Sequence, residues 1–497
     1  MKKLTIIMLI ALSFKTYGQG YNHQWLLGYF YFIQDPKGRL LFDSSSYTLV
    51  NETRKMVFMG TEANISDSNG NLLMSSNGVW IADATGDTMQ NGSGLNPWGV
   101  TSSWPYGLPM MNNNLLLPLP NDTFEYILFH HTATQLNSIH KCFELCYSLI
   151  DINQNSGLGQ VISKNNLIIS DTLMGGIGSC KHANGKDWWI FMMKDSSDII
   201  YKIALTDSSQ MSITSQKMNF SPLAVSNVAQ LTFSPSGNKF VATTYDNPIN
   251  RNSYVVISDF DRCTGMFSNT QTVQVTSGAY IWGTAFSPSG KYIYACSSQY
   301  VFQIDAATHT VDTIATYDGF ISPVGATCCP TTFWNMYLAA NGKIYITSGS
   351  GVQHLHEITY PDSAGTACKL QQHIINLGFG NLRAVPNHPN YYLGCDTTFG
   401  CTPCYTGINE IKQHDFKFSI SPNPSNGSFK IIYLLPQNKS GTLQIFDITG
   451  KEIYKQNLPP WSTMQYISLP KLANGVYNCT ITSNNERVHK KLVVFKE

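Results

Sequence analysis

Short apolar runs separated by polar turns are the dominant pattern along this chain. Around Gly290, a Ser-Gly turn leads at once into residues 291–295, where tyrosine and isoleucine predominate. A polar turn that opens into such a run is typical of a hairpin entering a strand. The same combination recurs over most of the chain, so the pattern predicts strands rather than helices.

The turns recur at a constant interval. Residues 233–240 and 286–293 both begin with Phe-Ser-Pro-Ser-Gly, which places Gly290 53 residues after Gly237. Other turns fall in the same frame at steps of 52 residues, apart from a single step of 63, and are marked by Gly70, Asp122, Gly185 and Gly342. A period near 50 residues with several strands per repeat predicts a β-propeller, in which each blade buries its faces against its neighbours.

Six turns account for six blades, and the segments left at the two ends indicate a seventh. Residues 21–59 and 376–395 together have about the length of one more repeat. We expect these ends to share a blade, because that arrangement closes the ring and leaves no free sheet edge. Six or eight blades are the alternatives, since terminal repeats are often atypical. For the repeat around Gly290, the pattern predicts strands at residues 281–287, 291–297, 300–306 and 309–316.

The amino terminus predicts an export signal. Two lysines precede an apolar run at residues 4–12, and a Thr-Tyr-Gly segment follows it. These are the parts of a secretory signal peptide, whereas a membrane span needs ~20 apolar residues. We therefore expect residues 1–18 to be removed by cleavage between Gly18 and Gln19, and residues 19–395 to form the propeller.

Composition narrows the classes of function. A chain of 497 residues is too long for one ordinary hydrophobic core, so two or more domains are expected. Charged residues make up 13% and the formal net charge is +1. Clusters of Lys and Arg that would neutralise phosphates are missing, so we expect no nucleic-acid partner. The 38 glycines and 12% aromatic residues fit an all-β protein.

The 12 cysteines all follow the predicted signal peptide, and an oxidising exterior permits disulfides among them. Cys395, Cys401 and Cys404 include a Cys-x-x-Cys pair that resembles half of a zinc site, but no second pair or nearby pair of histidines accompanies it. We therefore favour a disulfide at the domain junction, in a linker of residues 396–415. The adjacent cysteines at 328–329 leave open a vicinal bridge or two separately paired or buried thiols.

Beyond Cys404 the repeat frame ends, and residues 416–497 are expected to form a separate domain. Residues 443–451, 472–482 and 491–495 are short strand-like runs divided by turns. Such a segment predicts a small Ig-like β-sandwich of two sheets. The expected fold class is therefore all-β, a seven-bladed propeller followed by a sandwich.

This carboxy-terminal module resembles the type A sorting domain of the type IX secretion system in three stretches. PNPSNG at 422–427 matches the opening motif, FDITGK at 446–451 the middle one, and LANGVY at 472–477 with KKLVV at 490–494 the end. The positions that carry the match are Pro422, Asn423, Pro424, Gly427, Asp447, Gly450, Asn474, Gly475, Tyr477 and Lys491.

The resemblance implies a route and a set of partners. The protein would pass through the periplasm to the type IX secretion translocon and reach the outer cell surface. A sorting peptidase would remove the domain near residues 405–416, and the new end would be either released or attached to surface lipopolysaccharide. A plain adhesion-type sandwich is the alternative interpretation.

The repeats carry a second resemblance, to an uncharacterised family of secreted WD40-like propellers that are often joined to such sorting domains. It rests on residues 65–74, 89–95, 157–159 with 164–165, and 184–188. The similarity covers about residues 25–395. It implies a fold and a location, and no defined biochemistry.

Sequence motifs of catalysis are missing. No nucleophile elbow, HExxH helix or phosphate-binding glycine loop appears in its required context. We predict no catalytic residues, no cofactor and no metal site. Propeller enzymes can nevertheless assemble a site from scattered loops, so an enzyme remains the alternative.

Three features invite a functional interpretation, and each has a simpler one. His354 and His356 would share a strand face as a metal pair, but no third ligand accompanies them, which favours a solvated face. Residues 67–71 resemble the start of a calcium loop, but they lack its bidentate acid and coincide with a repeating turn. Tryptophans could stack on sugars, but they also fill the spaces between blades. These are Trp98, Trp104, Trp188, Trp189, Trp282 and Trp334.

We therefore predict a surface or extracellular binding protein that presents its loops to a glycan, peptide or protein ligand. The alternative is a secreted enzyme that degrades polysaccharide or peptide at the mouth of the channel. Two carboxyl groups about 5–10 Å apart in an open central pocket would favour a glycosidase. A flat or plugged channel would count against an enzyme.

Overall fold

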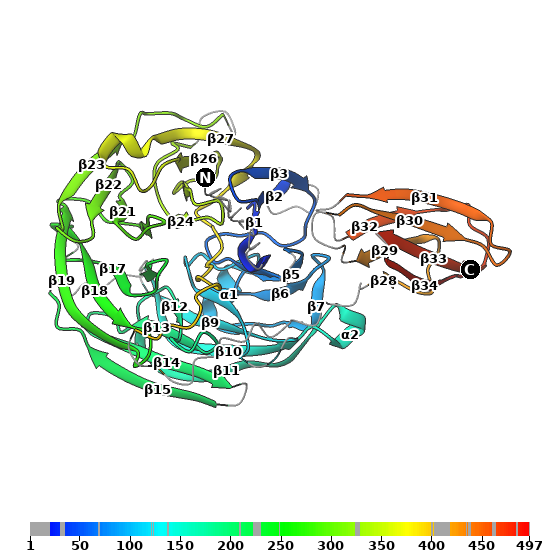
Figure 1. Ribbon diagram of the computed structural model, residues 1–497, viewed down its shortest axis with the longest axis horizontal. Helices are drawn as coiled ribbons and strands as arrows, with labels where there is room; N and C mark the ends of the chain where they lie inside the picture. The colour runs from blue at the N-terminus through cyan, green and yellow to red at the C-terminus, as the bar shows by residue number, and fades with distance from the viewer. Residues whose placement is uncertain are drawn as a thin grey trace, which may run out of the picture.

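Seven β-sheet blades surround a central channel in the computed structural model, and a smaller sandwich stands beside the ring (Figure 1). The all-β fold predicted from the sequence is confirmed. In the described part of the chain, no helix is both long enough and apolar enough to cross a bilayer. The structure describes residues 20–29, 35–67, 70–120, 122, 124–136, 139–207, 210–221, 230–247, 249–323, 329–398, 401, 418–433, 435, 439–459, 464–483 and 486–496.

The blades follow one another in chain order. The first three consist of β1 (Gln24–Leu27), β2 (Lys37–Phe42) and β3 (Tyr47–Glu52); β4 (Ala63–Ser66), β5 (Leu72–Ser76), β6 (Trp80–Asp83) and β7 (Thr88–Ser93); and β8 (Asn114–Pro118), β9 (Glu125–Leu136), β10 (Ile139–Asp151) and β11 (Gln160–Leu173). The fourth and fifth consist of β12 (Gly178–Lys181), β13 (Trp188–Met193), β14 (Ile199–Asp207) and β15 (Gln210–Lys217); and β16 (Thr232–Phe233), β17 (Lys239–Tyr245), β18 (Ser253–Asp261) and β19 (Met266–Thr276). The last two consist of β20 (Gly283–Phe286), β21 (Tyr292–Cys296), β22 (Tyr300–Asp305) and β23 (Val311–Thr316); and β24 (Met336–Leu338), β25 (Ile344–Ile346), β26 (Val352–Ile358) and β27 (Leu370–Asn381). The helices are short: η1 (Gly20–Asn22), α1 (Gly99–Ser103), α2 (Gln154–Gly157) and η2 (Gly365–Cys368).

The repeated turns occupy the same position in every blade that carries one, between its first and second strands. In each, the backbone amide of the marker residue donates to the carbonyl three residues earlier, as from Gly237 to Ser234 and from Gly290 to Ser287, both at 2.8 Å. The marker glycines adopt φ between 73° and 82°, a left-handed conformation that favours glycine. The repeat frame is therefore the period of one blade.

Strand lengths explain the one irregular step in that frame. The third blade is built from long strands, with 12, 13 and 14 residues in β9, β10 and β11. The added residues lengthen the chain between Asp122 and Gly185 without changing the order of strands. The four strands predicted around Gly290 are confirmed as β20 to β23.

The ring does not close as the sequence suggested. We expected the two ends of the propeller sequence to share a blade, but β1, β2 and β3 form a three-stranded blade without a carboxy-terminal strand. Residues 376–381 belong to β27, and residues 382–395 form no strand. Pro386 and Pro389 lie in this second segment, and a proline has no amide hydrogen to donate to a ladder. The shared-blade prediction is therefore wrong.

Closure rests on side-chain packing between the first and last blades. Trp25 and Phe42 from the first blade both contact the ring of Tyr345 from the last, with centroids 5.7 and 5.5 Å apart. All three side chains are buried. Burial of each large apolar side chain stabilises the fold by roughly 1.5–3 kcal/mol. A backbone hydrogen bond from the amide of Tyr29 to the carbonyl of Gly380, at 3.1 Å, adds to this packing.

The second and third blades are joined at their outer edges into one eight-stranded sheet. Lys164 Nζ donates to the backbone carbonyl and side-chain oxygen of Asn91, at 3.1 and 2.9 Å, and to the carbonyl of Ser93 at 2.8 Å. Asn165 Nδ2 donates to the carbonyl of Gly94 at 2.9 Å. Residues 89–95 and 164–165, two of the stretches that carried the propeller resemblance, thus contact each other and link the two blades by hydrogen bonds.

The carboxy-terminal domain is a sandwich of two antiparallel sheets. One contains β28 (Phe418–Ser421), β29 (Ser428–Tyr433) and β32 (Met464–Ser468); the other contains β31 (Glu452–Leu458), β30 (Gly441–Phe446), β33 (Gly475–Ser483) and β34 (Glu486–Val494). Phe429, Leu443 and Ile481 are fully buried between them, as is Cys479. Lys430 forms an ion pair with Asp87 in the turn after β6, so the sandwich contacts the second blade.

Candidate functional site in the channel

A carboxy-terminal segment of the propeller, residues 384–395, crosses the central channel. Asn387 Nδ2 donates to the carbonyls of Asn114 at 3.1 Å and Ile177 at 2.8 Å, and Asn390 Nδ2 donates to Pro235 at 2.7 Å. These acceptors belong to the third, fourth and fifth blades. Figure 1 shows this crossing segment as the yellow-orange trace that runs through the middle of the ring. The channel is therefore plugged rather than open from face to face.

Trp334 and Met111 face each other on the side of the ring away from the repeated turns. The Trp334 indole Nε1 lies 2.9 Å from Met111 Sδ, although the two residues come from the seventh and third blades. Just beneath, Asn335 Nδ2 lies 3.4 Å from Asn112 Oδ1, and the Tyr337 hydroxyl donates to the same oxygen at 2.9 Å. This end of the channel is closed by packed side chains.

A cavity of about 810 Å³ lies at the other end, on the face of the repeated turns. Its walls come from β12, β16, β20 and β24, the residues around β2, and the crossing segment. Hydroxyl and amide groups line it through Ser179, Thr232, Ser234, Thr284, Asn387 and Asn390, and aromatic residues through Phe42, Phe233, Phe286, Tyr337 and Tyr392. Its size is that of a small-molecule site.

Two polar atoms of residues that line the cavity have no hydrogen-bond partner among the residues that the structure describes. One is Ser179 Oγ, whose side chain is 7% exposed, and the other is Nδ1 of His388. His388 Nε2 lies 2.7 Å from the carbonyl oxygen of Asn64 and so must carry the proton, which leaves Nδ1 as an acceptor. Burial lowers the pKa of His388 to about 4, so the ring is neutral. Both atoms are buried, each with almost no accessible surface.

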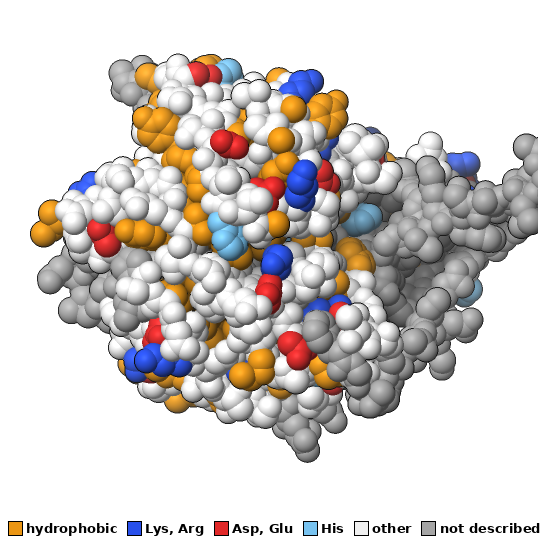
Figure 2. Space-filling model, turned by 60° about the vertical axis from the view of Figure 1, so that its left-hand side comes forward, with side chains coloured by type: hydrophobic (Ala, Val, Ile, Leu, Met, Phe, Trp, Pro, Cys, Tyr) orange, Lys and Arg blue, Asp and Glu red, His pale blue; other side chains and the backbone are white. Residues whose placement is uncertain are grey.

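Charge is sparse around the cavity. Among its described lining residues, Asp43 is the only acid and neither Lys nor Arg occurs. Hydrogen bonds from Ser46 and Ser45 lower the pKa of Asp43 to about 2, so it is ionised. Burial lowers the pKa of neighbouring His23, while Asp43 acts in the opposite direction. Figure 2 shows a similar character on the outside of the blades, where single charges are scattered among uncharged side chains.

A hydrogen-bonded chain of side chains resembles the catalytic chain of a serine hydrolase, but it lies in the protein interior. It consists of Ser148, His130 and Asn96. His130 Nε2 lies 2.9 Å from Ser148 Oγ, and its Nδ1 lies 2.7 Å from Asn96 Oδ1. All three residues are fully buried, and burial lowers the pKa of His130 to about 3. Because no substrate can reach Ser148, the chain is a buried polar network that specifies packing.

The structure shows the surroundings of the two histidines that the sequence suggested as a metal pair. His354 and His356 are buried instead of solvated, at 7% and 0% exposure. The Nδ1 atom of His354 lies 3.3 Å from Ser322 Oγ, and that of His356 accepts from the backbone of His373. The solvated face favoured from sequence is wrong, because Phe320 packs against the His354 ring and Phe333 against the His356 ring, with centroids 5.1 and 4.7 Å apart. Within the described residues, no group of three His, Cys, Asp or Glu is placed to hold a metal ion.

The other candidates proposed from sequence were the turn at residues 67–71 and the tryptophans. Asp67 accepts from the backbone and side chain of Asn71, at 2.9 and 3.1 Å, as a repeating turn requires. Trp188 and Trp189 are buried between blades, as the packing interpretation predicted. For Trp98 the packing interpretation is wrong, because this residue is 47% exposed. Trp282 and Trp334 stack on each other. Trp104 is partly buried and packs against the hydrophobic core that contains Trp188.

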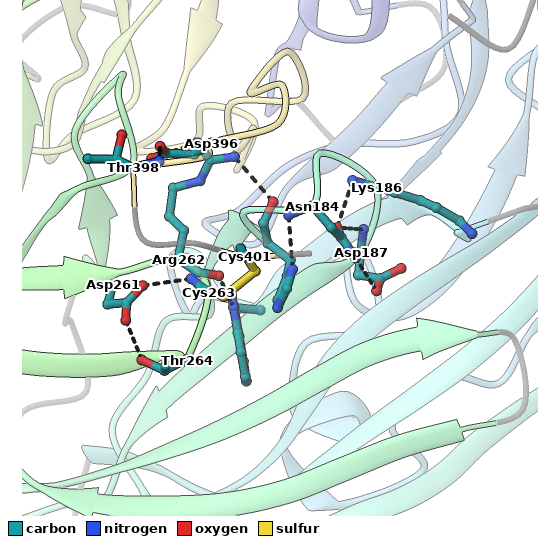
Figure 3. The surroundings of a disulfide bond; sticks show 12 residues. Asn184, Lys186, Asp187, Asp261, Arg262, Cys263, Thr264, Asp396, Thr398 and Cys401 are labelled. Carbon is teal, nitrogen blue, oxygen red and sulfur yellow. Dashed lines mark hydrogen bonds and ion pairs between the residues drawn. A yellow bond between two sulfur atoms is a disulfide. The ribbon is translucent and has the colours of Figure 1, made fainter. Parts of the chain in front are cut away.

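A disulfide joins Cys401 to Cys263 in the loop between β18 and β19, as Figure 3 shows. The prediction of a junction disulfide is confirmed for Cys401. Cys395 and Cys329 are also disulfide-bonded. Cys404 and Cys328, and most of the predicted linker, lie outside the described residues.

The three sorting motifs lie at one end of the sandwich. Asn423 Nδ2 donates to the carbonyl of Lys491 at 2.7 Å, and Asn474 Oδ1 accepts from the backbone of Lys496 at 2.8 Å. Pro422, Pro424 and Gly427 lie in the same connection as Asn423, and Gly475 and Tyr477 open β33. Asp447 and Gly450 form the turn after β30, next to the start of β33. Gly18 and Gln19 lie outside the described residues.

Sequence reasoning missed the residues of the cavity. Ser179 and His388 belong to no motif, and they come together only because the crossing segment enters the channel. The available hint was residues 384–392, where two prolines and two asparagines interrupt a stretch that would otherwise read as a strand.

Comparisons with known proteins establish the carboxy-terminal domain. Residues 419–495 match the family described as the secretion system C-terminal sorting domain. The resemblance noted in the sequence is thus confirmed for this domain, which marks the protein for type IX secretion to the outer cell surface. No curated protein matches the chain in sequence.

Solved structures similar to the chain are distant. The periplasmic gluconolactonase PpgL of Pseudomonas aeruginosa is 12% identical, with 90% of this chain and 99% of that one covered and a TM-score of 0.34. A chain of the nidogen/laminin complex is 9% identical, with 73% and 97% covered and a TM-score of 0.36. A putative TolB of Agrobacterium tumefaciens is 13% identical, with 66% and 97% covered and a TM-score of 0.29. None of them supplies a ligand or an activity for this chain.

Proposed function

We propose that this exported protein is a binding protein whose channel cavity takes a neutral sugar unit of a glycan. The observation that carries the proposal is the lining of a closed-ended cavity of about 810 Å³, which combines hydroxyl, amide and aromatic groups with very little charge. Sites for small molecules combine apolar walls with a few placed polar groups in this way.

The mixture of groups favours a carbohydrate over other small molecules. A sugar presents hydroxyl groups, which both donate and accept, and apolar C–H faces. The cavity offers hydroxyls such as Thr232 and Thr284, whose oxygens lie 3.2 Å apart, amides such as Asn390, and aromatic side chains such as Tyr392. Because Asp43 is the only acid and neither Lys nor Arg occurs among the described lining residues, a neutral ligand fits better than an ionic one.

Two features support binding over hydrolysis. The crossing segment plugs the channel where a propeller enzyme would gather its acids. A glycosidase ordinarily needs a pair of carboxyl groups about 5–10 Å apart, and the described lining residues include a single carboxylate, Asp43. We therefore favour a binding protein over the enzyme that the sequence left open.

The proposal also includes the route by which the protein is exported. The signal peptide would be cleaved between Gly18 and Gln19, and the end of the sandwich that carries Asn423, Asp447 and Asn474 would face the translocon. The sorting peptidase would cut near residues 405–416, and the propeller would then be released or attached to lipopolysaccharide. The propeller would keep Cys401 and its bond to Cys263, so the cavity would survive the cut.

The test is a glycan array probed with the full chain, followed by affinity measurements and analysis of products. Ser179→Leu fills the cavity and is expected to weaken binding of a neutral glycan at least tenfold, about 1.4 kcal/mol. Ser215→Leu, on the exposed face of β15, is the matched control. Equal loss in both variants, or no binding to any neutral glycan, would overturn the proposal. Release of shorter sugars would favour the enzyme instead.

A further inference from the structure

A row of aromatic rings crosses the closed face of the propeller, opposite the cavity. Trp334 stacks on Trp282 with centroids 3.9 Å apart and planes 13° apart. Tyr280 lies 5.6 Å from Trp282, and Tyr245 lies 4.9 Å from Tyr280. Arg383 completes the row, with its guanidinium 5.0 Å from the centre of the Trp334 ring.

Stacking within the row limits which surfaces of the rings a ligand can contact. Trp334 has Trp282 near one face and Arg383 near its ring centre, and Trp282 is flanked by Trp334 and Tyr280. A sugar face therefore has no free indole face on which to lie. The guanidinium of Arg383 is half-buried, and its two terminal nitrogens lack partners among the described residues.

Arg383 is held in place without a counter-ion. Its Nε donates to the carbonyl of Gly349 at 3.1 Å, and its two terminal nitrogens have no partner among the described residues. Burial lowers the pKa of this guanidinium, and no neighbouring carboxylate raises it. A desolvated charge that is left unpaired costs free energy, and an anion would recover it.

The backbone fixes the same side chain. Arg383 has a φ of 59°, in the left-handed region that non-glycine residues rarely adopt. The conformation is held by a hydrogen bond from its amide to Ser348 at 3.1 Å and one from Thr347 Oγ1 to its carbonyl at 2.9 Å. Such strain persists where the surroundings over-determine it, often at ligand sites.

We infer that Arg383 and the edges of Trp334 and Trp282 form a second site, which binds the carboxylate of an acidic sugar. The two free nitrogens of a guanidinium match a carboxylate in a fork of parallel hydrogen bonds. The rest of the row offers ring edges and tyrosine hydroxyls, which suit the neutral hydroxyl groups of a uronic-acid polymer. A second guanidinium, that of Arg251, lies 5.5 Å from the centre of the Tyr280 ring, where it suits a further carboxylate of the same polymer.

The test compares three polymers binding to the full chain. Polygalacturonate carries the carboxylates, its fully methyl-esterified form lacks their charge, and poly-glutamate carries carboxylates on a peptide. We expect binding to polygalacturonate, at least tenfold weaker binding to the ester, and weakening as salt rises. Equal binding to the ester would overturn the role of the carboxylate. Equal binding to poly-glutamate would overturn the assignment to a sugar.

Variants keep the test specific. Arg383→Met is expected to lose at least tenfold in affinity and Arg383→Lys, which keeps the charge but not the fork, an intermediate amount. Lys217→Met removes one exposed charge from β15 and should bind as the parent does. Thermal unfolding checks that each variant is folded, and equal affinity of folded Arg383→Met would refute the site. Ser179→Leu should leave this binding unchanged, so failure here is distinguishable from failure of the cavity proposal.

Discussion

The guanidinium of Arg262 donates to the carbonyl oxygen of Gly394 at 2.7 Å and to that of Lys181 at 2.9 Å. One buried side chain thus joins the fifth blade to the fourth and to the end of the crossing segment. Cys263, the next residue, adds the disulfide to Cys401 (Figure 3). The crossing segment is therefore anchored where it leaves the channel, which keeps the cavity wall in place.

Removal of this disulfide should loosen the crossing segment. We expect Cys401→Ser to lower the free energy of unfolding by about 2–4 kcal/mol, because the bond constrains a long loop in the unfolded chain. Denaturant unfolding measures this loss, and limited proteolysis should cut residues 384–401 faster in the variant.

The matched control is Cys263→Ser. Each single variant and the double variant should lose the same stability, because all three remove one bond. If the double variant were less stable than either single variant by more than about 1 kcal/mol, the cysteines would act separately and the anchoring role would be wrong.

Two turns at the same position in the repeat should respond differently to the same change. A Cβ at Gly185 would lie 2.7 Å from the backbone nitrogen of Cys395, whereas a Cβ at Gly290 would have its nearest neighbour at 3.7 Å. Both glycines have φ in the left-handed region, at 79° and 75°. We expect Gly185→Ala to cost at least about 1 kcal/mol more than Gly290→Ala, because it adds a clash to the same backbone strain.

Paired unfolding curves of the two glycine variants measure that difference directly. Gly70→Ala is a further control, since its nearest neighbour would lie 3.7 Å away and its φ is 82°. Equal losses in all three variants would mean that the crossing segment does not pack tightly on the fourth blade.

Acid should destabilise the propeller through buried neutral histidines. Burial lowers the pKa of His130 and His356 to about 3 and that of His388 to about 4, from an ordinary value of 6.5. Between these values the unfolded chain binds protons that the folded chain does not. Stability is therefore complete above pH 6.5 and falls as the pH drops toward 4, by up to about 1.4 kcal/mol per pH unit for each histidine.

His130→Gln tests this assignment. Whatever it costs at pH 7, the variant should show a slope of stability against pH between 6 and 4.5 that is smaller by about one proton. Urea unfolding at a series of pH values gives the slope. An unchanged slope would show that His130 is already protonated in the folded protein.

Much of the fold was readable from the sequence because its causes are local. The turn at Gly290 needs a residue that tolerates positive φ, and the strand that follows needs aromatic and β-branched residues, so both appear within ten positions of each other. The sorting motifs around Pro422 and Gly475 were readable for the same reason. Closure of the ring was misjudged, because residues 382–395 have the length of a missing strand but contain two prolines.

The sequence by itself determined the repeat, the strands of each blade and the sorting domain, because turn chemistry and apolar patterning act between near neighbours. Only the tertiary structure decided the plug, the cavity, the Cys263–Cys401 bond and the unpaired state of Arg383. Each depends on contacts between distant residues, such as Asn387 and Asn114, which are 273 positions apart. Such contacts leave no periodic trace in a chain, and they exist only when the ring has closed around the crossing segment.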